Sequence, residues 1–457
     1  MTSLLKTRLI SATLFLLLFM ASPLAGNAQT KADFDELKTQ LLTLQQKTAQ
    51  LEKRLAQAES RHVSAAASKS IIESDLPIVQ ADEKGFDIRS RDEKFSVHVG
   101  GYIQADGRFF SQGDDQHKSI DTFMMRRVRP ILEGTVAKDF HFFIMPDFGD
   151  GKAVLQDAFI EYTRYEAAQF RVGKFREPVG LEMLQSAKDL LFMERGLPTN
   201  IVPIRDVGAM LSGQFMGGVL NYQVGIFNGV RDGASGDSDN NDDKDVAGRL
   251  WVQPFKLTKI AALQGLGFGV AGTYGEETGL PPEYKTPAQQ ISFHYNASTV
   301  VDGDRYRIVP QFYYSWGPLG LLGEYALSKS QVRNGTTAAP IESDAWQLAA
   351  TYVLTGENAS FKGVKPKKDF GEDGFGAWEL AARYGELNVD QDAFRLGFAD
   401  EQDSVRSEKS FEIGLNWYLN RNVKAVLDWE HTSFVGGDLK GNRESENALL
   451  TRVQLAF

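Results

Sequence analysis

The chain contains no cysteine, and none of its apolar runs reaches the length of a membrane-spanning helix. The absence of cysteine excludes a disulfide framework, a thiolate metal site and a lipidated thiol. A spanning helix needs about 20 apolar residues, and the run Leu9–Met20 is shorter than this. We therefore expect a protein without a transmembrane helix.

Basic residues and catalytic patterns are also scarce. Lys and Arg number 50 against 60 Asp and Glu, which gives a formal net charge of −10. Nucleic-acid binders normally carry the opposite sign, so we set that class aside. The six histidines show no metal-ligand spacing, and the chain has no nucleophile elbow and no phosphate-binding Walker loop. We expect no enzyme activity, no cofactor and no metal site.

The first 28 residues have the pattern of a secretory signal. Lys6 and Arg8 precede the apolar run Leu9–Met20, and the small residues of Gly26–Ala28 supply a cleavage pattern. This predicts a signal peptide over residues 1–28 and an exported mature protein.

A heptad pattern follows over residues 31–60. Its seam, with alternating spacings of three and four residues, is Phe34, Leu37, Leu41, Leu44, Thr48, Leu51, Leu55 and Ala58. Such spacing predicts a short coiled coil, and one helix cannot bury this seam alone, so self-association is expected. The alternative is a single amphipathic helix lying on the rest of the chain.

The composition and then the hydrophobic period change after the helix. Residues 61–94 are first rich in Ala and Ser and then charged, with Pro77 and Gly85, and we expect a linker there. From Phe95 to Phe457 apolar and polar residues alternate with a period near two, which predicts β-strands. We assign residues 95–457 to one β-domain.

Alternation alone is typical of a soluble sandwich as well as of a membrane barrel. The strand count and the loop lengths distinguish the two folds. Short turns such as 317–318 and 420–421 alternate with long polar loops such as 276–303 and 387–407. The sixteen strands are expected near 95–110, 121–137, 139–147, 154–165, 169–175, 207–216, 218–227, 245–255, 266–275, 304–316, 319–328, 344–354, 376–386, 408–419, 421–432 and 447–457. We predict an all-β transmembrane fold, a 16-stranded antiparallel outer-membrane β-barrel with a periplasmic N-terminal coiled coil.

One long loop, residues 176–206, lies between two short strands and mixes apolar with basic residues. A long loop with its own apolar content is usually packed against something and is often functional. We predict that it folds into the barrel mouth and narrows it. The alternative is a surface excursion that covers one sheet edge.

The densest basic cluster within a strand is Arg126, Arg127 and Arg129. Arg127 and Arg129 share the parity of Glu133, opposite the apolar residue Val128. A charge on the lipid face costs about 2–4 kcal/mol at mid-membrane, so this polar face is expected in the lumen. Arg126 has the other parity, which predicts a position at the rim or in a bulge.

Acidic residues of lumenal parity are about as numerous as basic ones, so the two signs nearly cancel around the wall. Any ion selectivity must therefore come from where individual basic residues lie. We predict a basic constriction made of Arg127, Arg129, Lys174, Arg176, Arg195 and Arg205. The alternative is that these bases form ion pairs that stiffen the wall or lie on the surface. The acidic stretch Asp237–Asp245 lacks the Gly and Glu of an EF-hand, and we expect a solvated outside loop that binds divalent ions at most loosely.

Several segments between about Gly100 and Phe457 resemble the phosphate-selective porins, the O and P porin group. They are Phe123–Val136 (FMMRRVRPILEGTV), Val172–Glu182 (VGKFREPVGLE), Met193–Leu211 (MERGLPTNIVPIRDVGAML), Tyr352–Glu357 (YVLTGE), Gly376–Tyr384 (GAWELAARY) and Gly414–Trp429 (GLNWYLNRNVKAVLDW). The resemblance implies a trimeric sixteen-stranded barrel in outer-membrane lipid, with its third outside loop tucked inside. It also implies diffusion of anions across the outer membrane.

Three functions are therefore held together. The first is a passive channel for small anions, phosphate-like oxyanions in particular. The second is a general or cation-preferring porin for small hydrophilic solutes, which the net negative charge favours. The third is a structural tether of the cell envelope, in which the barrel only anchors the N-terminal coiled coil.

Overall fold

The computed structural model describes residues 31–111, 119–239, 241–371 and 373–457, and the expected signal segment 1–28 lies outside them. The chain divides into two compact units, Met1–Leu76 and Pro77–Phe457. They correspond to a helix and a β-domain, and each is considered by itself below.

In the first unit, helix α2 runs from Lys31 to Asp75 and is 45 residues long. It ends just before Pro77, because a proline disfavours the helical conformation of the residue that precedes it. Seam leucines at five heptad positions, Leu37, Leu41, Leu44, Leu51 and Leu55, are between 47% and 64% exposed. The seam is thus unburied in a single chain. Among the helices in the described residues, none is both long and apolar enough to cross a bilayer.

The expectation of a linker over residues 61–94 needs correction. The Ala-rich part continues helix α2 to Asp75, and strands β1 (Ile78–Asp82) and β2 (Gly85–Arg89) form a hairpin after it. Strand β2 pairs with the first residues of β3 (Ser96–Phe110), where Phe86 lies opposite Val99. The first residues of β3 extend beyond the end of β21, which pairs with β3 only from Tyr102 onward. The hairpin pairs with this stretch of β3, which would otherwise be an unpaired edge.

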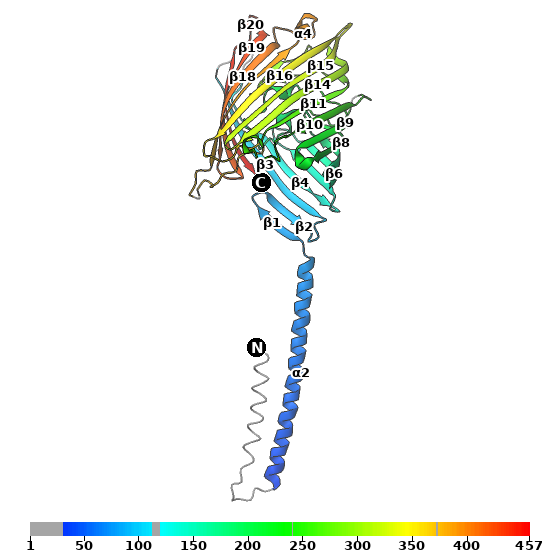
Figure 1. Cartoon of the computed structure of the whole chain (residues 1–457), viewed down its shortest axis with the longest axis vertical. Helices are drawn as coiled ribbons and strands as arrows, with labels where there is room; N and C mark the ends of the chain where they lie inside the picture. The colour runs from blue at the N-terminus through cyan, green and yellow to red at the C-terminus, as the bar shows by residue number, and fades with distance from the viewer. Residues whose placement is uncertain (1–30, 112–118, 240, 372) are drawn as a thin grey trace. The chain divides into compact units, whose positions relative to one another are not determined.

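A single sheet holds nineteen strands within the described residues, and without β1, β2 and the short β20 it is a closed barrel of sixteen (Figure 1). The last strand pairs with the first, with Thr451 opposite Gly107. The barrel strands are β3, β4 (Thr122–Val136), β5 (Phe140–Asp147), β6 (Val154–Tyr165), β7 (Ala168–Phe175), β8 (Asp206–Phe215), β9 (Leu220–Phe227), β10 (Asp245–Val252), β11 (Gly267–Gly279), β14 (Thr299–Trp316), β15 (Leu319–Asn334), β16 (Thr337–Val353), β17 (Ala377–Val389), β18 (Val405–Tyr418), β19 (Val423–Asp438) and β21 (Glu446–Ala456). The predicted sixteen-stranded antiparallel barrel is confirmed.

Short elements occupy the connections. They are α3 (Leu181–Leu184), η2 (Leu197–Asn200), η3 (Met216–Gly218), η4 (Ala261–Leu263), β12 (Tyr284–Lys285), β13 (Ile291–Phe293), α4 (Gln391–Arg395) and β20 (Gly441–Asn442). Strands β15 and β16 extend further than predicted, into residues 329–343, which were expected to be a loop. Outward positions there are charged, as in the cross-strand pair Lys329 and Glu342, so the apolar alternation stops while the ladder continues.

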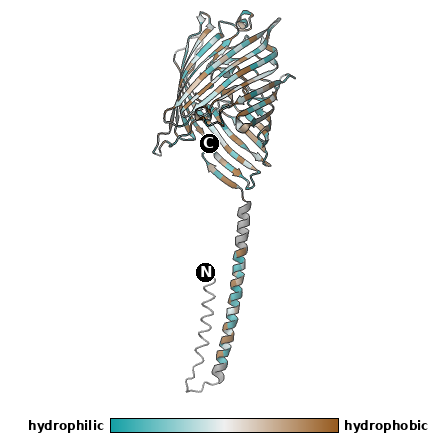
Figure 2. Ribbon diagram, in the orientation of Figure 1, coloured by the Kyte–Doolittle hydropathy of each residue, from teal (hydrophilic) through white to brown (hydrophobic). Residues whose placement is uncertain are grey.

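Apolar and polar residues alternate along the barrel strands, as the striped colouring in Figure 2 shows, and the exposed fractions place the apolar ones outside. On β18, Phe411 and Ile413 face outward and are 40% and 42% exposed, while Glu412 between them is fully buried. Outward aromatic residues cluster near one end, where Trp378 and Trp417 stack with ring centroids 5.0 Å apart. Apolar faces outward, charges inward and aromatic girdles are the arrangement that a surrounding bilayer requires.

Candidate functional site

Residues 176–205, here called the inserted loop, leave the wall at the end of β7 and return to it at β8. The apolar residues Val179, Met183 and Leu197 of this loop are no more than 2% exposed and belong to a core shared with wall residues such as Met210 and Phe227. Its backbone also bonds side chains of distant strands: the Leu181 amide donates to Glu324 Oε2 at 2.6 Å and the Met193 amide donates to Asp428 Oδ2 at 2.7 Å. The loop therefore lies inside the barrel, against lumen-facing side chains.

We call the lumen-facing side chains that hold this loop the covered wall. They come from β15–β19, β21 and β3, and include Gln104, Arg108, Glu324, Gln347, Arg383, Asn416, Lys424, Asp428, Arg452 and Gln454. Several of them bond backbone carbonyls of the loop, as Lys424 Nζ does to Leu190 O and Asn416 Nδ2 to Leu191 O, both at 2.8 Å. One half of the lumen is thus occupied by protein.

Glu194 of the inserted loop gathers four arginines around one carboxylate. Arg126 Nε lies 2.6 Å from Oε1, Arg127 NH2 lies 2.9 Å from Oε2, and Arg108 NH2 lies 2.9 Å from Oε1. Arg452 adds a longer contact of 3.6 Å. Burial raises the pKa of Glu194, but the four guanidinium groups outweigh burial and hold it well below its usual range.

Arg126 reaches this cluster because strand β4 contains a bulge. In the pairing with β3, Gln104 lies opposite Arg127 while the next residue, Ala105, lies opposite Met125, so Arg126 is the extra residue. Of the two positions that its parity allowed, rim or bulge, the bulge is the one observed. Three arginines of one short segment therefore reach the lumen.

The other strand arginine, Arg129, is held in place by wall residues. Its Nε donates to Asp147 Oδ2 at 2.7 Å and its NH1 donates to the Tyr102 hydroxyl at 2.8 Å. On the opposite side, Arg383 bridges Glu182 of the loop at 2.8 Å and Glu412 of β18, and it also donates to the Glu194 carbonyl at 3.0 Å. Arg383 thus ties the loop to the covered wall.

The four bases predicted from the loop and its flanks differ in their partners. Lys174 pairs with Asp237, and Arg205 Nε lies 2.9 Å from Asp157 Oδ2. Arg176 and Arg195 donate instead to backbone carbonyls, both of them to Gln185 O, at 2.9 Å and 2.6 Å. In the described part of the chain neither of these two forms an ion pair with a carboxylate.

A cavity of about 320 Å³ brings most of these bases together, and we call it the basic mouth. Its charged lining residues are Arg126, Arg127, Arg129, Arg195, Arg205, Arg231 and Lys285 with Glu194, Asp232 and Glu283. Four of the six predicted residues line it: Arg127, Arg129, Arg195 and Arg205. Lys174 and Arg176 do not line it.

The prediction missed Arg126, Arg231 and Lys285 as lining residues. The last two lie in the connections 228–244 and 276–303, which were predicted to be long polar loops. For Lys285 the sequence did carry a signal, namely the aromatic residues Tyr284 and Phe293 in the same connection. In the structure they are 1% and 0% exposed, so this connection packs inward.

The acidic stretch Asp237–Asp245 is matched by bases. Asp245 Oδ2 lies 2.7 Å from Arg305 NH2 and 3.3 Å from Arg307 NH1, and Asp239 lies 2.6 Å from Lys244. Among the residues that the structure describes, no group of three or more potential ligands could hold a metal ion. Asp245 thus forms buried ion pairs with wall arginines, while Asp242, Asp243 and Lys244 are exposed as expected of an outside loop.

Comparison with known proteins agrees with this geometry. A family model described as phosphate-selective porin O and P matches residues 97–457. The chain belongs to the phosphate-selective porin O and P family. Porin O of Pseudomonas aeruginosa is 23% identical over 440 residues, which cover 88% of this chain and 98% of the relative.

Solved structures of similar fold include the outer membrane channel DcaP of Acinetobacter baumannii, with a TM-score of 0.53 and 12% identity over 81% of this chain and 99% of that one. An anion-selective porin from Comamonas acidovorans has a TM-score of 0.52 and 11% identity, over 79% and 100% of the two chains. At these identities the likeness shows the fold. The protein is thus a porin of the bacterial outer membrane, and belongs to a family of channels and not of enzymes.

Proposed function

We propose that this porin is a passive channel for small anions, phosphate-like oxyanions among them, which pass through the basic mouth. The observation that carries the proposal is the charge of that cavity, where seven bases face three acids. The anion selectivity named in the family description and in the Comamonas acidovorans structure supports the same reading.

The chemistry of the mouth suits a hydrated oxyanion. A selective channel has to replace water with hydrogen-bond donors without holding the ion too tightly. Guanidinium groups present forked donors to two oxygens at once, and here carboxylates such as Glu194 and Asp157 temper most of them. Burial lowers the pKa of Arg195 to about 10, and the nearby Glu182 carboxylate opposes this fall, so this loop arginine stays charged at neutral pH. The result is a donor-rich passage with moderate net charge.

The test is the reversal potential of single channels in a KCl gradient, followed by addition of phosphate. An anion-selective potential and a phosphate block of the chloride current are expected. The competing function is a general or cation-preferring porin, which the net charge of −10 and the paired wall favour. A cation-selective potential would establish that alternative and overturn the proposal.

We also propose that helix α2 forms a periplasmic coiled coil and that the porin is a homotrimer. The exposed heptad leucines support this because an apolar seam needs a partner. Deleting residues 31–75 is expected to leave single-channel current unchanged and to weaken the oligomer. Analytical ultracentrifugation in detergent measures the change, and an unaltered trimer would show that the barrel alone holds the assembly.

A further inference from the structure

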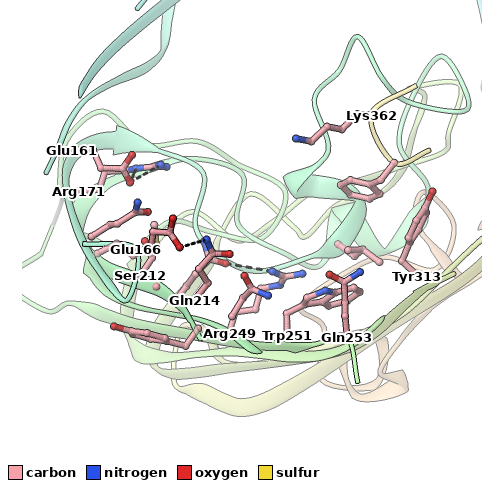
Figure 3. Close-up of a pocket in the computed structure, with 18 residues that line it drawn as sticks. Glu161, Glu166, Arg171, Ser212, Gln214, Arg249, Trp251, Gln253, Tyr313 and Lys362 are labelled. Atoms are coloured by element: carbon pink, nitrogen blue, oxygen red, sulfur yellow. Dashed lines mark hydrogen bonds and ion pairs between the residues drawn. The ribbon is translucent and has the colours of Figure 1, made fainter. Parts of the chain in front are cut away.

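A second, larger cavity of about 740 Å³ lies toward the tight-turn ends of β6–β10 and β14, and we call it the inner cavity (Figure 3). It lies on the other side of α3 from the basic mouth, since Met183 lines the mouth and Leu181 lines the inner cavity. The lumen-facing side chains of β7–β10 form its floor and are here called the open wall. They are Gln169, Arg171, Ser212, Gln214, Asn221, Gln223, Arg249, Trp251 and Gln253.

Trp251 is built into this wall as a flat platform. It lies opposite Gly269 in the pairing of β10 with β11, and the indole covers Gly267 as well. A Cβ at Gly269 would come within 2.6 Å of Trp251 Cε3, so a side chain there would push the ring off the sheet. Figure 3 shows the indole lying along the strands at the floor of the cavity. The other ring face points toward the lumen, where the Arg249 guanidinium covers part of it.

The guanidinium of Arg249, a hydrogen-bond donor, lies against the indole of Trp251. The Arg249 guanidinium carbon is 4.9 Å from the centroid of the Trp251 ring. Its Nε donates to Gln311 Oε1 at 3.1 Å and its NH1 to Gln223 Oε1 at 3.5 Å, and in the described residues it forms no ion pair. Neutral partners thus hold Arg249 and leave donor capacity toward the cavity.

Amides and further aromatic rings surround the platform. An amide side chain has two donor hydrogens and an acceptor, the combination that hydroxyl groups need because they both donate and accept. Gln214, Asn221 and Gln223 each use one of these groups within the protein and keep the others. Tyr313 and Phe361 face the cavity from another side, with ring centroids 5.3 Å apart. The charges are few and partly matched, since Arg171 NH2 lies 2.9 Å from Glu161 Oε1.

We propose that the inner cavity binds uncharged sugar rings. A sugar ring presents C–H groups on a face and hydroxyls around its edge; the first suit the negative face of an aromatic ring, and the second suit amides and a guanidinium. The charged lining is mixed: Arg171, Arg249 and Lys362 stand with Glu161 and Glu166, so the cavity has a smaller excess of bases than the mouth and offers an inorganic anion less. The volume fits a small oligosaccharide within the usual range of ligand pockets, roughly 300–1,000 Å³.

The test is the block of chloride current through single channels by maltose added on the tight-turn side, compared with a polyethylene glycol of equal size. Maltose is expected to block at a concentration at least about tenfold lower than the polymer, because the polymer lacks stacking faces. Trp251→Ala is expected to raise the half-blocking concentration of maltose about tenfold, and Trp251→Phe, which keeps a ring, by less than about threefold. The matched control is Trp346→Ala, which alters an outward aromatic residue that packs on Tyr384.

Folding and anion selectivity are monitored separately. Each variant must show wild-type conductance without sugar, and Gln253→Ala provides a second lining variant if Trp251→Ala does not insert. Phosphate block is expected to be the same in wild type and in Trp251→Phe, because the mouth lies elsewhere. Equal block by maltose and by the polymer in wild type, or unchanged maltose block in Trp251→Ala, would overturn the sugar site and leave the anion channel untouched.

Discussion

The covered wall and the open wall of one barrel use polar side chains for different purposes. On the covered wall, Arg383 and Arg452 are 1% and 3% exposed and are bonded to carboxylates. On the open wall, side chains such as Ser212 and Gln223 are only half-buried and line a cavity. Both kinds of residue share the lumenal parity of their strands, so parity places a side chain in the lumen without showing whether solute or protein will meet it.

A charged side chain on the lumenal face of a strand therefore does not always face the permeant solute. A charge enclosed by the inserted loop has lost its water and has to be compensated by an opposite charge and hydrogen bonds. Arg452 illustrates this, with Nε and NH2 each 2.7 Å from an oxygen of Asp106. Bases that line an open cavity, such as Arg195 at the mouth and Arg249 in the inner cavity, remain available to meet the permeant solute.

The largest effect is expected where the covered wall is broken. Arg383→Ala would leave the carboxylates of Glu182 and Glu412 buried without their partner, at a cost of about 3–5 kcal/mol. We expect a lower Tm in detergent, measured by circular dichroism, and flickering single-channel current from a loosened loop. Arg395→Ala is the control, since that side chain is 72% exposed and, among the residues that the structure describes, its one ion pair is with Asp392. Equal Tm values for the two variants would refute the assigned role of Arg383.

A smaller effect, on selectivity and not on stability, is expected at the mouth. Arg195→Gln removes a charge that is bonded to backbone carbonyls and not to an acid. At low salt we expect the chloride-to-potassium permeability ratio to fall about threefold, because the mouth loses one positive charge and the local potential becomes less positive. Arg305→Gln is the contrast, since Arg305 is paired with Asp245 and Glu277 and is expected to leave the ratio unchanged. Reversal potentials measure both, and a larger shift in Arg305→Gln would reverse the ranking.

The salt concentration gives another test of the difference between charges at the mouth and charges enclosed by the inserted loop. Raising KCl from 0.1 M to 1 M shortens the screening length from about 10 Å to about 3 Å. The mouth is open to solvent ions, so its anion preference is expected to fall steeply over this range. Buried pairs such as Arg452 with Asp106 are shielded from these ions, and the Tm should change little. The check is a parallel series of reversal potentials and melting curves, in which a fall in Tm that follows the loss of selectivity would contradict the separation.

The sequence predicted the barrel well because alternation and loop length are local properties. The sixteen strands were all placed, and Arg127 and Arg129 were assigned to the lumen by parity. The hairpin over residues 78–89 was missed because it pairs with the part of β3 that extends beyond β21. That difference in strand ends arises only when the sheet closes. The parity of Arg126 left the rim and a bulge open, and only the pairing of β4 with β3 decides for the bulge.

The smallest effect is expected from adding a charge to the open wall. Ser212 has Gln169 and Gln223 as its cross-strand neighbours, so the lysine of Ser212→Lys could extend into the cavity and keep its water. We expect stability within about 0.5 kcal/mol of wild type, as for other surface changes, and a slight gain in anion preference. Asn416→Lys is the corresponding change on the covered wall, where the asparagine is 0% exposed and bonds the Leu191 carbonyl, and burying an unpaired ammonium there should prevent stable folding. Two variants with equal Tm values would mean that the loop does not enclose its wall, and the contrast between the two halves of the lumen would be lost.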